Sequence, residues 1–210
     1  MEYDDSRIIL KQQTFYALLD KESLVKENIN LLKFLEFLST KNIKLLQYRN
    51  KSPKNFKEIE DDLKLIKKHF NGKVIVNDYL KFIDLADGIH LGQEDLLKIN
   101  PSKKEAARIV RQKVGKNKFF GLSTHNLEEI KEANEFDLDY IGLGAYRATS
   151  TKKDANVLGE KIFKLAKYSF FPVAIIGGVK LDDQFPEEVF IKVIGSDLIR
   201  KFKESKDEKV

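Results

Sequence analysis

The chain of 210 residues is long enough for one sizeable hydrophobic core and too short for two large domains. With 42% hydrophobic and 34% charged residues, it is typical of folded globular proteins, which excludes a largely disordered one. The net charge of +5 arises from 38 basic residues spread among 33 acidic ones, so we expect no nucleic-acid partner. The sequence shows no membrane span, no signal peptide and no cysteine, so we expect no membrane association and a cytoplasmic location.

Short apolar runs and amphipathic segments alternate along the whole sequence. The apolar runs predict strands at residues 15–19, 43–48, 73–77, 88–91, 118–122, 139–143, 172–176 and 189–194. Between them, apolar residues at helical spacing predict helices within residues 28–41, 56–70, 103–114, 127–136 and 159–169. The links at residues 80–85 and 181–188 are shorter and give a weaker helical pattern. We expect Gly72 to stop the second of these helices with a positive φ.

This alternation predicts a parallel sheet covered by helices. Eight strands without a domain break predict a single-domain α/β protein, a (β/α)8 TIM barrel spanning residues 1–210. We place the barrel at about residues 14–200 and expect a charged C-terminal tail at 203–210. The alternative is a doubly wound open sheet. It would need a glycine-rich turn after the first strand, where the sequence instead has Leu19-Asp20-Lys21-Glu22.

Polar residues and glycines follow the C-terminal ends of the predicted strands, and a parallel barrel gathers these ends into one mouth. From the second strand to the eighth they are Gln47-Tyr48-Arg49-Asn50-Lys51, Asn77-Asp78, Gln93-Glu94-Asp95, Ser123-Thr124-His125, Thr149-Ser150-Thr151-Lys152-Lys153, Gly177-Gly178 and Gly195-Ser196. Polar groups in so many loops of one face indicate a shared functional site.

The residue types in this mouth divide into acids and phosphate-binding groups. Asp78 and Asp95 supply the hard oxygen ligands that suit Mg²⁺, an ion that usually bridges to substrate phosphates. Positive charge to neutralise a polyphosphate would come from Arg49, Lys51 and Lys152. The glycines after the last two strands offer backbone N–H groups for a phosphate monoester. The set indicates a metal-bound diphosphate and a second phosphate, and hence two substrates that are joined.

Structural roles stay open for several of these residues when each is taken alone. Asp78 could cap the helical segment that follows it, Asp95 could cap a turn, and residues 149–155 could form a solvated loop. His90 is expected on an interior wall with a hydrogen bond. For His125 at the mouth, a capping or supporting role is expected ahead of a role as general base.

Six motifs together resemble the thiamine phosphate synthase family and its sister group, the thiazole tautomerases. They are QYRNK at 47–51, VND at 76–78, HLGQED at 90–95, GLSTH at 121–125, TSTKKDA at 149–155 and IGGV at 176–179. The similarity extends from about residue 15 to residue 198. The combination of VND, HLGQED and TKKDA at these spacings is specific, although each motif alone is not.

The resemblance implies a (β/α)8 barrel that joins hydroxymethylpyrimidine diphosphate to hydroxyethylthiazole phosphate in thiamine biosynthesis, releasing pyrophosphate, with Mg²⁺ as cofactor. It implies that Asp78 and Asp95 hold the metal. Pyrimidine diphosphate would bind at Gln47, Tyr48, Arg49, Asn50, Lys51, Asn77, Ser123 and Lys152, and thiazole phosphate at Thr149, Ser150, Thr151, Gly178, Gly195 and Ser196. The expected catalytic residues are Arg49, Lys51, Lys152 and Ser123. The partners are phosphorylated small molecules, and a homo-oligomer is left open.

The sequence departs from the family pattern mainly on the thiazole-phosphate side. Residues 144–149 lack the two prolines of the usual GPIFPT, Asn50 replaces a common glutamate, and the segment between Gly178 and Ser196 is several residues shorter than is typical. Three hypotheses therefore stand: the synthase, a thiazole tautomerase that uses His125, and a non-catalytic or diverged paralogue that binds a phosphorylated thiamine precursor. The paired aspartates and the TKK segment favour the synthase, because isomerising a thiazole needs no departure of pyrophosphate.

Overall fold

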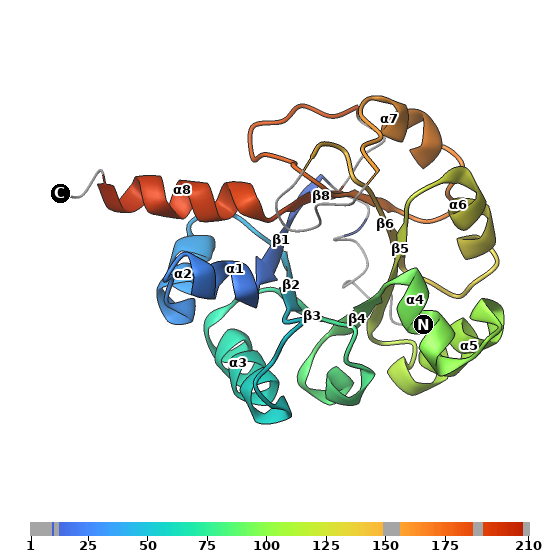
Figure 1. Cartoon of the computed structure of the whole chain (residues 1–210), viewed down its shortest axis with the longest axis horizontal. Helices are drawn as coiled ribbons and strands as arrows, with labels where there is room; N and C mark the ends of the chain where they lie inside the picture. Colours follow the sequence, from blue (N-terminus) through green and yellow to red (C-terminus); the bar gives the residue numbers. More distant parts are fainter. Residues whose placement is uncertain (1–9, 11–12, 149–155, 187–190, 208–210) are drawn as a thin grey trace, which may run out of the picture.

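Eight parallel strands close into a barrel in the computed structural model, which describes residues 10, 13–148, 156–186 and 191–207. The strands are β1 (Thr14–Asp20), β2 (Leu45–Arg49), β3 (Lys73–Asn77), β4 (Gly88–Leu91), β5 (Phe119–Thr124), β6 (Tyr140–Leu143), β7 (Val173–Ile175) and β8 (Ile191–Ile194). Each pairs with its neighbours in sequence, and β8 pairs with β1 to complete the ring (Figure 1). This closure confirms the predicted barrel and excludes the open sheet.

Helices surround the barrel wall. They are α1 (Lys21–Lys26), α2 (Leu31–Ser39), α3 (Phe56–His69), the 3-10 helix η2 (Leu80–Leu85), α4 (Gln93–Ile99), α5 (Lys103–Val114), α6 (Leu127–Ala133), α7 (Lys161–Ala166) and α8 (Ser196–Asp207). Each predicted helical region contains one of them, whereas α1, α4 and α8 were not predicted. Within the described part of the chain, every helix is too short or too polar to cross a lipid bilayer.

Helix α3 shows how the local sequence forms these elements. The side chain of Asn55 accepts a hydrogen bond from the backbone N–H of Glu58 (3.0 Å), which caps the first turn. Ile59, Leu63 and Ile66 recur at helical spacing on one face, and all three are completely buried. Lysines occupy the opposite face, so the helix can pack on the barrel along a single stripe.

The prediction that Gly72 stops α3 with a positive φ was wrong. The helix ends at His69, and Gly72 is not among the described glycines that have a positive φ. A Cβ atom at this position would lie 2.6 Å from the carbonyl oxygen of Lys44 and 2.6 Å from the ring of Phe70. Close packing before β3, rather than a left-handed turn, therefore requires a glycine here.

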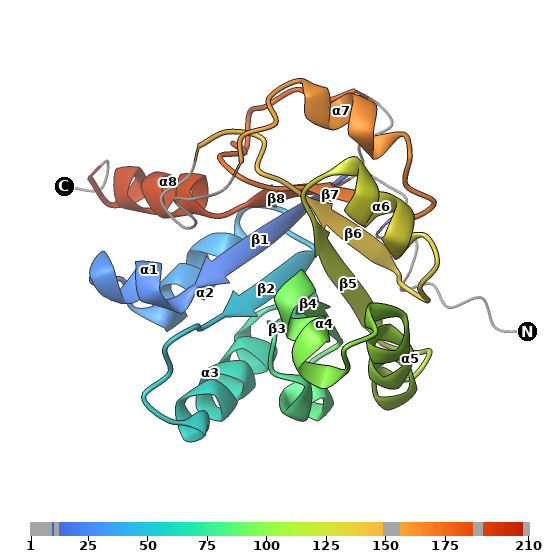
Figure 2. The same cartoon turned by 45° about the vertical axis from the view of Figure 1, so that its right-hand side comes forward.

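The C-terminal tail was also predicted to begin too early. Helix α8 continues to Asp207, so residues 203–207 are helical instead of forming a charged extension. The ring of Phe202 packs edge-on against Phe34 of α2 (5.5 Å between centroids), and Lys203 forms an ion pair with Glu27 beside α1 (2.7 Å). These contacts hold α8 next to α1 and α2 (Figure 2), and the C-terminal end of the helix lies outside the barrel wall.

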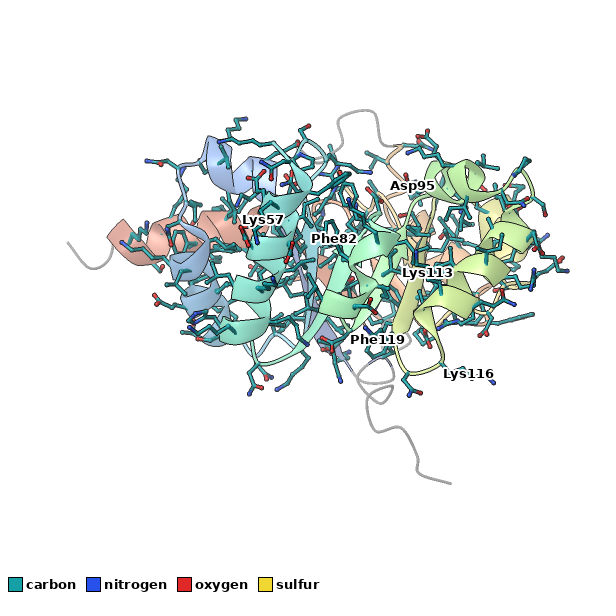
Figure 3. The ribbon with its side chains drawn as sticks, turned by 90° about the horizontal axis from the view of Figure 1, so that it is seen from below. Lys57, Phe82, Asp95, Lys113, Lys116 and Phe119 are labelled. Carbon is teal, nitrogen blue, oxygen red and sulfur yellow. The ribbon has the colours of Figure 1, made fainter. Side chains whose placement is uncertain are left out.

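Alternate residues of each strand point into the barrel or outward to the helices. The inward residues form their own apolar core, which includes Tyr16, Leu45, Ile75, Phe119, Tyr140, Ala174, Ile191 and Val193. Outward residues pack with the helices into a second, larger core. In Figure 3, Asp95 lies toward the upper face of the molecule and Phe119 toward the lower face. The inner core thus fills the barrel below the strand ends and leaves the mouth for polar residues.

Candidate active site

A cavity of about 510 Å³ opens at the C-terminal ends of the strands. Its size is within the range of sites for small molecules. Many of the site residues predicted from the sequence line it, and they come from loops on both sides of the mouth: Gln47, Arg49, Lys51, Asn77, Asp78, Asp95, Ser123, Gly178, Gly195 and Ser196. The barrel therefore brings the strand-end motifs together, as expected.

The structure does not bring Tyr48 and Asn50 to this cavity, which corrects their predicted role as substrate-binding residues. Tyr48 lies between two inward-facing residues of β2, so its side chain points outward, and its hydroxyl donates to Asp62 of α3 (2.6 Å). The side-chain amide of Asn50 is buried and donates to the Tyr48 hydroxyl (3.3 Å). Four further predicted residues lie outside the described part of the chain: Thr149, Ser150, Thr151 and Lys152.

Asp78 and Asp95 lie side by side at one edge of the cavity, with their carboxyl groups within hydrogen-bonding reach. Asp78 follows β3 in a left-handed conformation (φ 65°), and its backbone N–H donates to the carbonyl oxygen of His90 (3.0 Å). Asp95 is in the first turn of α4, where its carboxylate accepts from the N–H of Gly92 (3.2 Å). The capping alternative therefore applies to Asp95 and not to Asp78, because η2 begins after Tyr79 without a side-chain cap.

The two carboxyl groups have different electrostatic environments. Burial raises the pKa of Asp78 to about 6, Asp95 adds to this rise, and the Lys51 ammonium opposes it. Burial also acts to raise the pKa of Asp95, but hydrogen bonds with Lys98 and Asp78 outweigh it and lower that pKa below its ordinary value. Lys51 forms an ion pair with Asp78, and Lys98 forms one with Asp95 (2.7 Å). A cation that binds between Asp78 and Asp95 would therefore be stabilised by their negative charge.

The donor chemistry of this pair fits Mg²⁺. The described residues contain no cluster of three or more histidine, aspartate or glutamate side chains that could hold a metal ion. Mg²⁺ is commonly held by only one or two carboxylates and completes its six ligands with water and substrate phosphates. Asp78 and Asp95 would thus suffice as the protein ligands.

Cations lie on the same side of the mouth as the acids. Arg49, at the end of β2, forms an ion pair with Asp20 at the end of β1 (2.5 Å) and lines the cavity. The side chain of Lys51 is 42% exposed while it contacts Asp78. A long, exposed lysine can exchange one anionic partner for another at little cost, since exposed ion pairs contribute little free energy.

The opposite side of the mouth consists of backbone turns. Gly177 and Gly178 follow β7 with positive φ angles of 94° and 62°, which other residues rarely adopt. Gly195 precedes the first turn of α8, where backbone N–H groups favour an anion. Arg147 does not line the cavity. Its guanidinium donates to the carbonyl oxygen of Gly178 (3.1 Å) and to Asp183 (2.6 Å).

Polar residues to which the sequence assigned no binding role also line the cavity, among them His90, Glu129 and Gln93, the last of which was predicted only to lie at the mouth. His90 lies in the barrel interior with hydrogen bonds from both ring nitrogens, as its wall position predicted, and burial lowers its pKa to about 4. Gln93 donates to the carbonyl oxygen of Ser123 (2.7 Å), and its own buried oxygen has no hydrogen-bond partner in the described part of the chain. His125 contacts Glu129 through Nδ1 (2.9 Å). For His90 the signal in the sequence was the HLGQED motif, and Gln93 was also among the polar residues that follow the fourth predicted strand.

The chain is similar to known proteins over most of its length. A family model described as thiamine monophosphate synthase matches residues 15–186. A thiamine-phosphate synthase of Persephonella marina is 34% identical over 172 residues, which covers 79% of this chain and 77% of that protein. One of Prochlorococcus marinus is 33% identical over 184 residues, which covers 85% of this chain, and the chain spans about half (48%) of that relative's length. A solved thiamine phosphate pyrophosphorylase from Pyrococcus furiosus has the same fold (TM-score 0.67, 21% identity, 94% of this chain and 98% of that chain covered).

Proposed function

Because this chain belongs to the thiamine monophosphate synthase family, we propose that it joins hydroxymethylpyrimidine diphosphate to hydroxyethylthiazole phosphate and releases pyrophosphate. The observation that supports this most is the adjacency of Asp78 and Asp95 at the rim of one cavity that also contains Arg49 and Lys51. Acids for a divalent ion and cations for a diphosphate are thereby in reach of a single ligand. The product would be thiamine phosphate.

The metal side of the proposal rests on the fit of the two aspartates to Mg²⁺. Asp78 and Asp95 would hold the ion, and the ion would neutralise charge on the departing pyrophosphate. Arg49, Lys51 and Lys152 would take up the rest of that charge. On this proposal Lys51 leaves Asp78 when metal and substrate enter, because the metal then satisfies the carboxylate and the diphosphate offers the lysine a new partner.

The reaction needs positioning more than acid–base chemistry. When pyrophosphate leaves first, the pyrimidinylmethyl carbon becomes a cation that the thiazole nitrogen can capture directly. Gln47, Asn77 and Ser123 would orient the pyrimidine, and the glycine turns at Gly178 and Gly195 would hold the thiazole phosphate on the opposite side. Fixed cations near the leaving group then lower the barrier, since they stabilise charge that develops in the transition state.

One assay tests this function. The purified protein is incubated with both substrates and Mg²⁺, and thiamine phosphate is followed by chromatography. We expect product, and loss of product in Asp78→Ala and Asp95→Ala, whereas Asp61→Ala on the exposed face of α3 serves as the matched control. Absence of product with either substrate still bound would favour a non-catalytic paralogue. Tautomerisation of a thiazole phosphate that His125→Ala abolishes would favour the tautomerase.

The same proposal extends to the partners, the location and the oligomeric state of this protein. Phosphorylated small molecules would be the partners of this chain, and a cytoplasmic location and a homo-oligomer stay predictions. Size-exclusion chromatography with light scattering would measure the oligomeric state directly.

A further inference from the structure

Five side chains from five strands form one continuous line of hydrogen bonds beneath the cavity. We call it the hydroxyl chain, and its members in order are Gln47, Tyr16, Tyr140, His90 and Ser123. The successive distances are 3.0 Å (Gln47 Nε2 to Tyr16 Oη), 2.9 Å (Tyr16 Oη to Tyr140 Oη), 3.1 Å (Tyr140 Oη to His90 Nδ1) and 2.9 Å (His90 Nε2 to Ser123 Oγ). Both ends line the cavity, so the chain connects two parts of the mouth through the barrel interior.

The barrel holds the middle of this chain rigidly. A Cβ atom on Gly121 would lie 2.2 Å from the Tyr140 ring, and one on Gly142 would lie 3.0 Å from the His90 ring, so two glycines make the space for these rings. Tyr140 stacks on His90 with 5.5 Å between centroids and meets Tyr16 edge-on at 5.9 Å. The rings are packed in place, and their hydroxyl groups have few other directions to bond.

The order of donors follows from counting hydrogens along the chain. Gln47 donates its amide N–H to the Tyr16 oxygen, so the hydrogen of Tyr16 is free to donate to Tyr140. Tyr140 then donates to Nδ1 of His90. A neutral imidazole carries one proton, and with Nδ1 accepting, that proton is on Nε2 and is donated to Ser123 Oγ. The Ser123 hydrogen is the one left over, at the surface of the cavity.

We propose that the hydroxyl chain is a polarised positioning device, in which Tyr16 and Tyr140 keep the His90 proton on Nε2 and thereby make the Ser123 hydroxyl a hydrogen-bond donor to the substrate. The device acts at a distance, since neither tyrosine lines the cavity. The hydroxyl chain also fixes the orientation of the Gln47 amide at its other end. An amide that donates to Tyr16 through its nitrogen presents its carbonyl oxygen to the cavity. Turning the Gln47 amide over would reverse every bond and leave Ser123 as an acceptor only.

The chemical use of this polarity rests on the proposed function. The ring nitrogens of a pyrimidine accept hydrogen bonds, so a donor at Ser123 can hold the ring in one orientation over the acid pair. A serine whose hydrogen is already committed to His90 could not provide that donor. The carbonyl oxygen of Gln47, an acceptor, would bind only a hydrogen-bond donor of the substrate. Tyr16 and Tyr140 would therefore be positioning residues for the pyrimidine substrate and have no role toward the thiazole substrate.

The protonation pattern can be observed without any activity. Two-bond ¹H–¹⁵N correlation spectra of the intact protein distinguish a protonated from an unprotonated ring nitrogen, and only three histidines contribute signals. We expect the His90 proton on Nε2 in the natural sequence and a mixture of both tautomers in Tyr140→Phe. A proton on Nδ1 in the natural sequence would overturn the proposal. Tyr16→Phe breaks the same chain one link earlier and serves if Tyr140→Phe fails to fold.

Kinetics separate this role from a loss of packing. We expect each tyrosine variant to raise the KM for the pyrimidine diphosphate by up to about tenfold, as loss of one oriented hydrogen bond should, with the KM for the thiazole phosphate unchanged. Ile66→Val removes a methyl group from the buried face of α3 and shows how a loss of stability alone changes the two KM values. Tyr168→Phe shows the effect of removing an exposed hydroxyl group. Equal changes in both KM values would contradict the proposal.

A double-mutant cycle completes the test. If Tyr140 acts only through Ser123, then Ser123→Ala combined with Tyr140→Phe should have the same pyrimidine KM as Ser123→Ala alone. Additive effects would overturn the inference. If the His90 proton is on Nε2 but the protein has no coupling activity, the result would support the polarity of the hydroxyl chain and refute the proposed function. Coupling with normal KM values in both tyrosine variants would refute the hydroxyl chain and keep the function.

Discussion

Arg147 and Asp183 form an ion pair with two hydrogen bonds, Nη1 to Oδ2 at 2.6 Å and Nη2 to Oδ1 at 2.9 Å, that joins the segment after β6 to the segment after β7. Asp183 also accepts from the backbone N–H of Lys180 (2.8 Å), and Arg147 donates to the carbonyl oxygen of Gly178. The pair braces the glycine turn in the region where the sequence lacks the two prolines of the family pattern and is shorter. A planar guanidinium suits this role, because its fork fixes both carboxylate oxygens.

Breaking this pair should affect one substrate only. We expect Asp183→Asn to raise the KM for hydroxyethylthiazole phosphate roughly tenfold, because the Gly177-Gly178 turn is no longer held in place. The KM for the pyrimidine diphosphate should not change. Asp182→Asn makes the same chemical change at an exposed neighbouring residue and is the control. A similar rise for both substrates would show that the pair supports the whole mouth.

The raised pKa of Asp78 predicts a dependence of stability on pH. Its pKa in the folded protein is about 6, compared with 3.8 for an ordinary aspartate. The folded state therefore binds the proton more tightly, and this group's contribution to stability is complete below pH 4 and is lost as the pH rises through 6. In metal-free protein we expect the Tm to fall over this interval.

Neutralising Asp78 should remove that effect. We expect Asp78→Asn to raise the Tm at pH 7.5 by about 2–4 °C, the equivalent of about 1 kcal/mol in a protein of this size, and to abolish coupling. At pH 4 the same substitution should give no gain, because the proton already neutralises the carboxyl group. Differential scanning calorimetry at both pH values checks this. A lower Tm in Asp78→Asn at pH 7.5 would mean that the ion pair with Lys51 outweighs burial.

A buried ion pair outside the mouth should matter for stability alone. Arg111 of α5 donates to Asp139 before β6 (2.7 Å), and the same carboxylate accepts from the N–H of Phe120 (2.8 Å). We expect Arg111→Met to lower the free energy of unfolding by about 3–5 kcal/mol, because it leaves a buried carboxylate without its counter-charge. Urea denaturation measures this. Arg108→Met, on the exposed face of the same helix, should have little effect.

Lys152 lies outside the described residues, so its predicted role rests on the TKKDA motif. We expect Lys152→Ala to lower the rate of coupling at saturating substrates by roughly tenfold or more, as loss of a charge that stabilises the leaving group should. The measurement is the initial rate of thiamine phosphate formation, with Lys68→Ala on α3 as a control. An unchanged rate would remove Lys152 from the catalytic residues.

Much of the fold and part of the site follow from local patterns. The predicted bounds of β3 and β4 coincide with the observed strands, since turn residues flank both apolar runs. The meeting of Asp78 and Asp95 was also predictable, because neighbouring parallel strands end at the same rim. Tyr48 was misplaced because its motif was considered as a block. The strand period of two, applied from Gln47, would have turned its side chain outward.

The sequence by itself determined the barrel, the acids at its rim and the family, because alternation and motif spacing are properties of neighbouring residues. The tertiary structure alone decided the contacts inside. Tyr16 and Tyr140 are 124 positions apart, and their hydroxyl groups meet at 2.9 Å only because β1 and β6 face each other across a closed barrel. Likewise, no local pattern pairs Arg147 with Asp183. Such contacts depend on strand register, on glycines that admit a ring, and on side-chain rotamers, and these are settled together when the barrel closes.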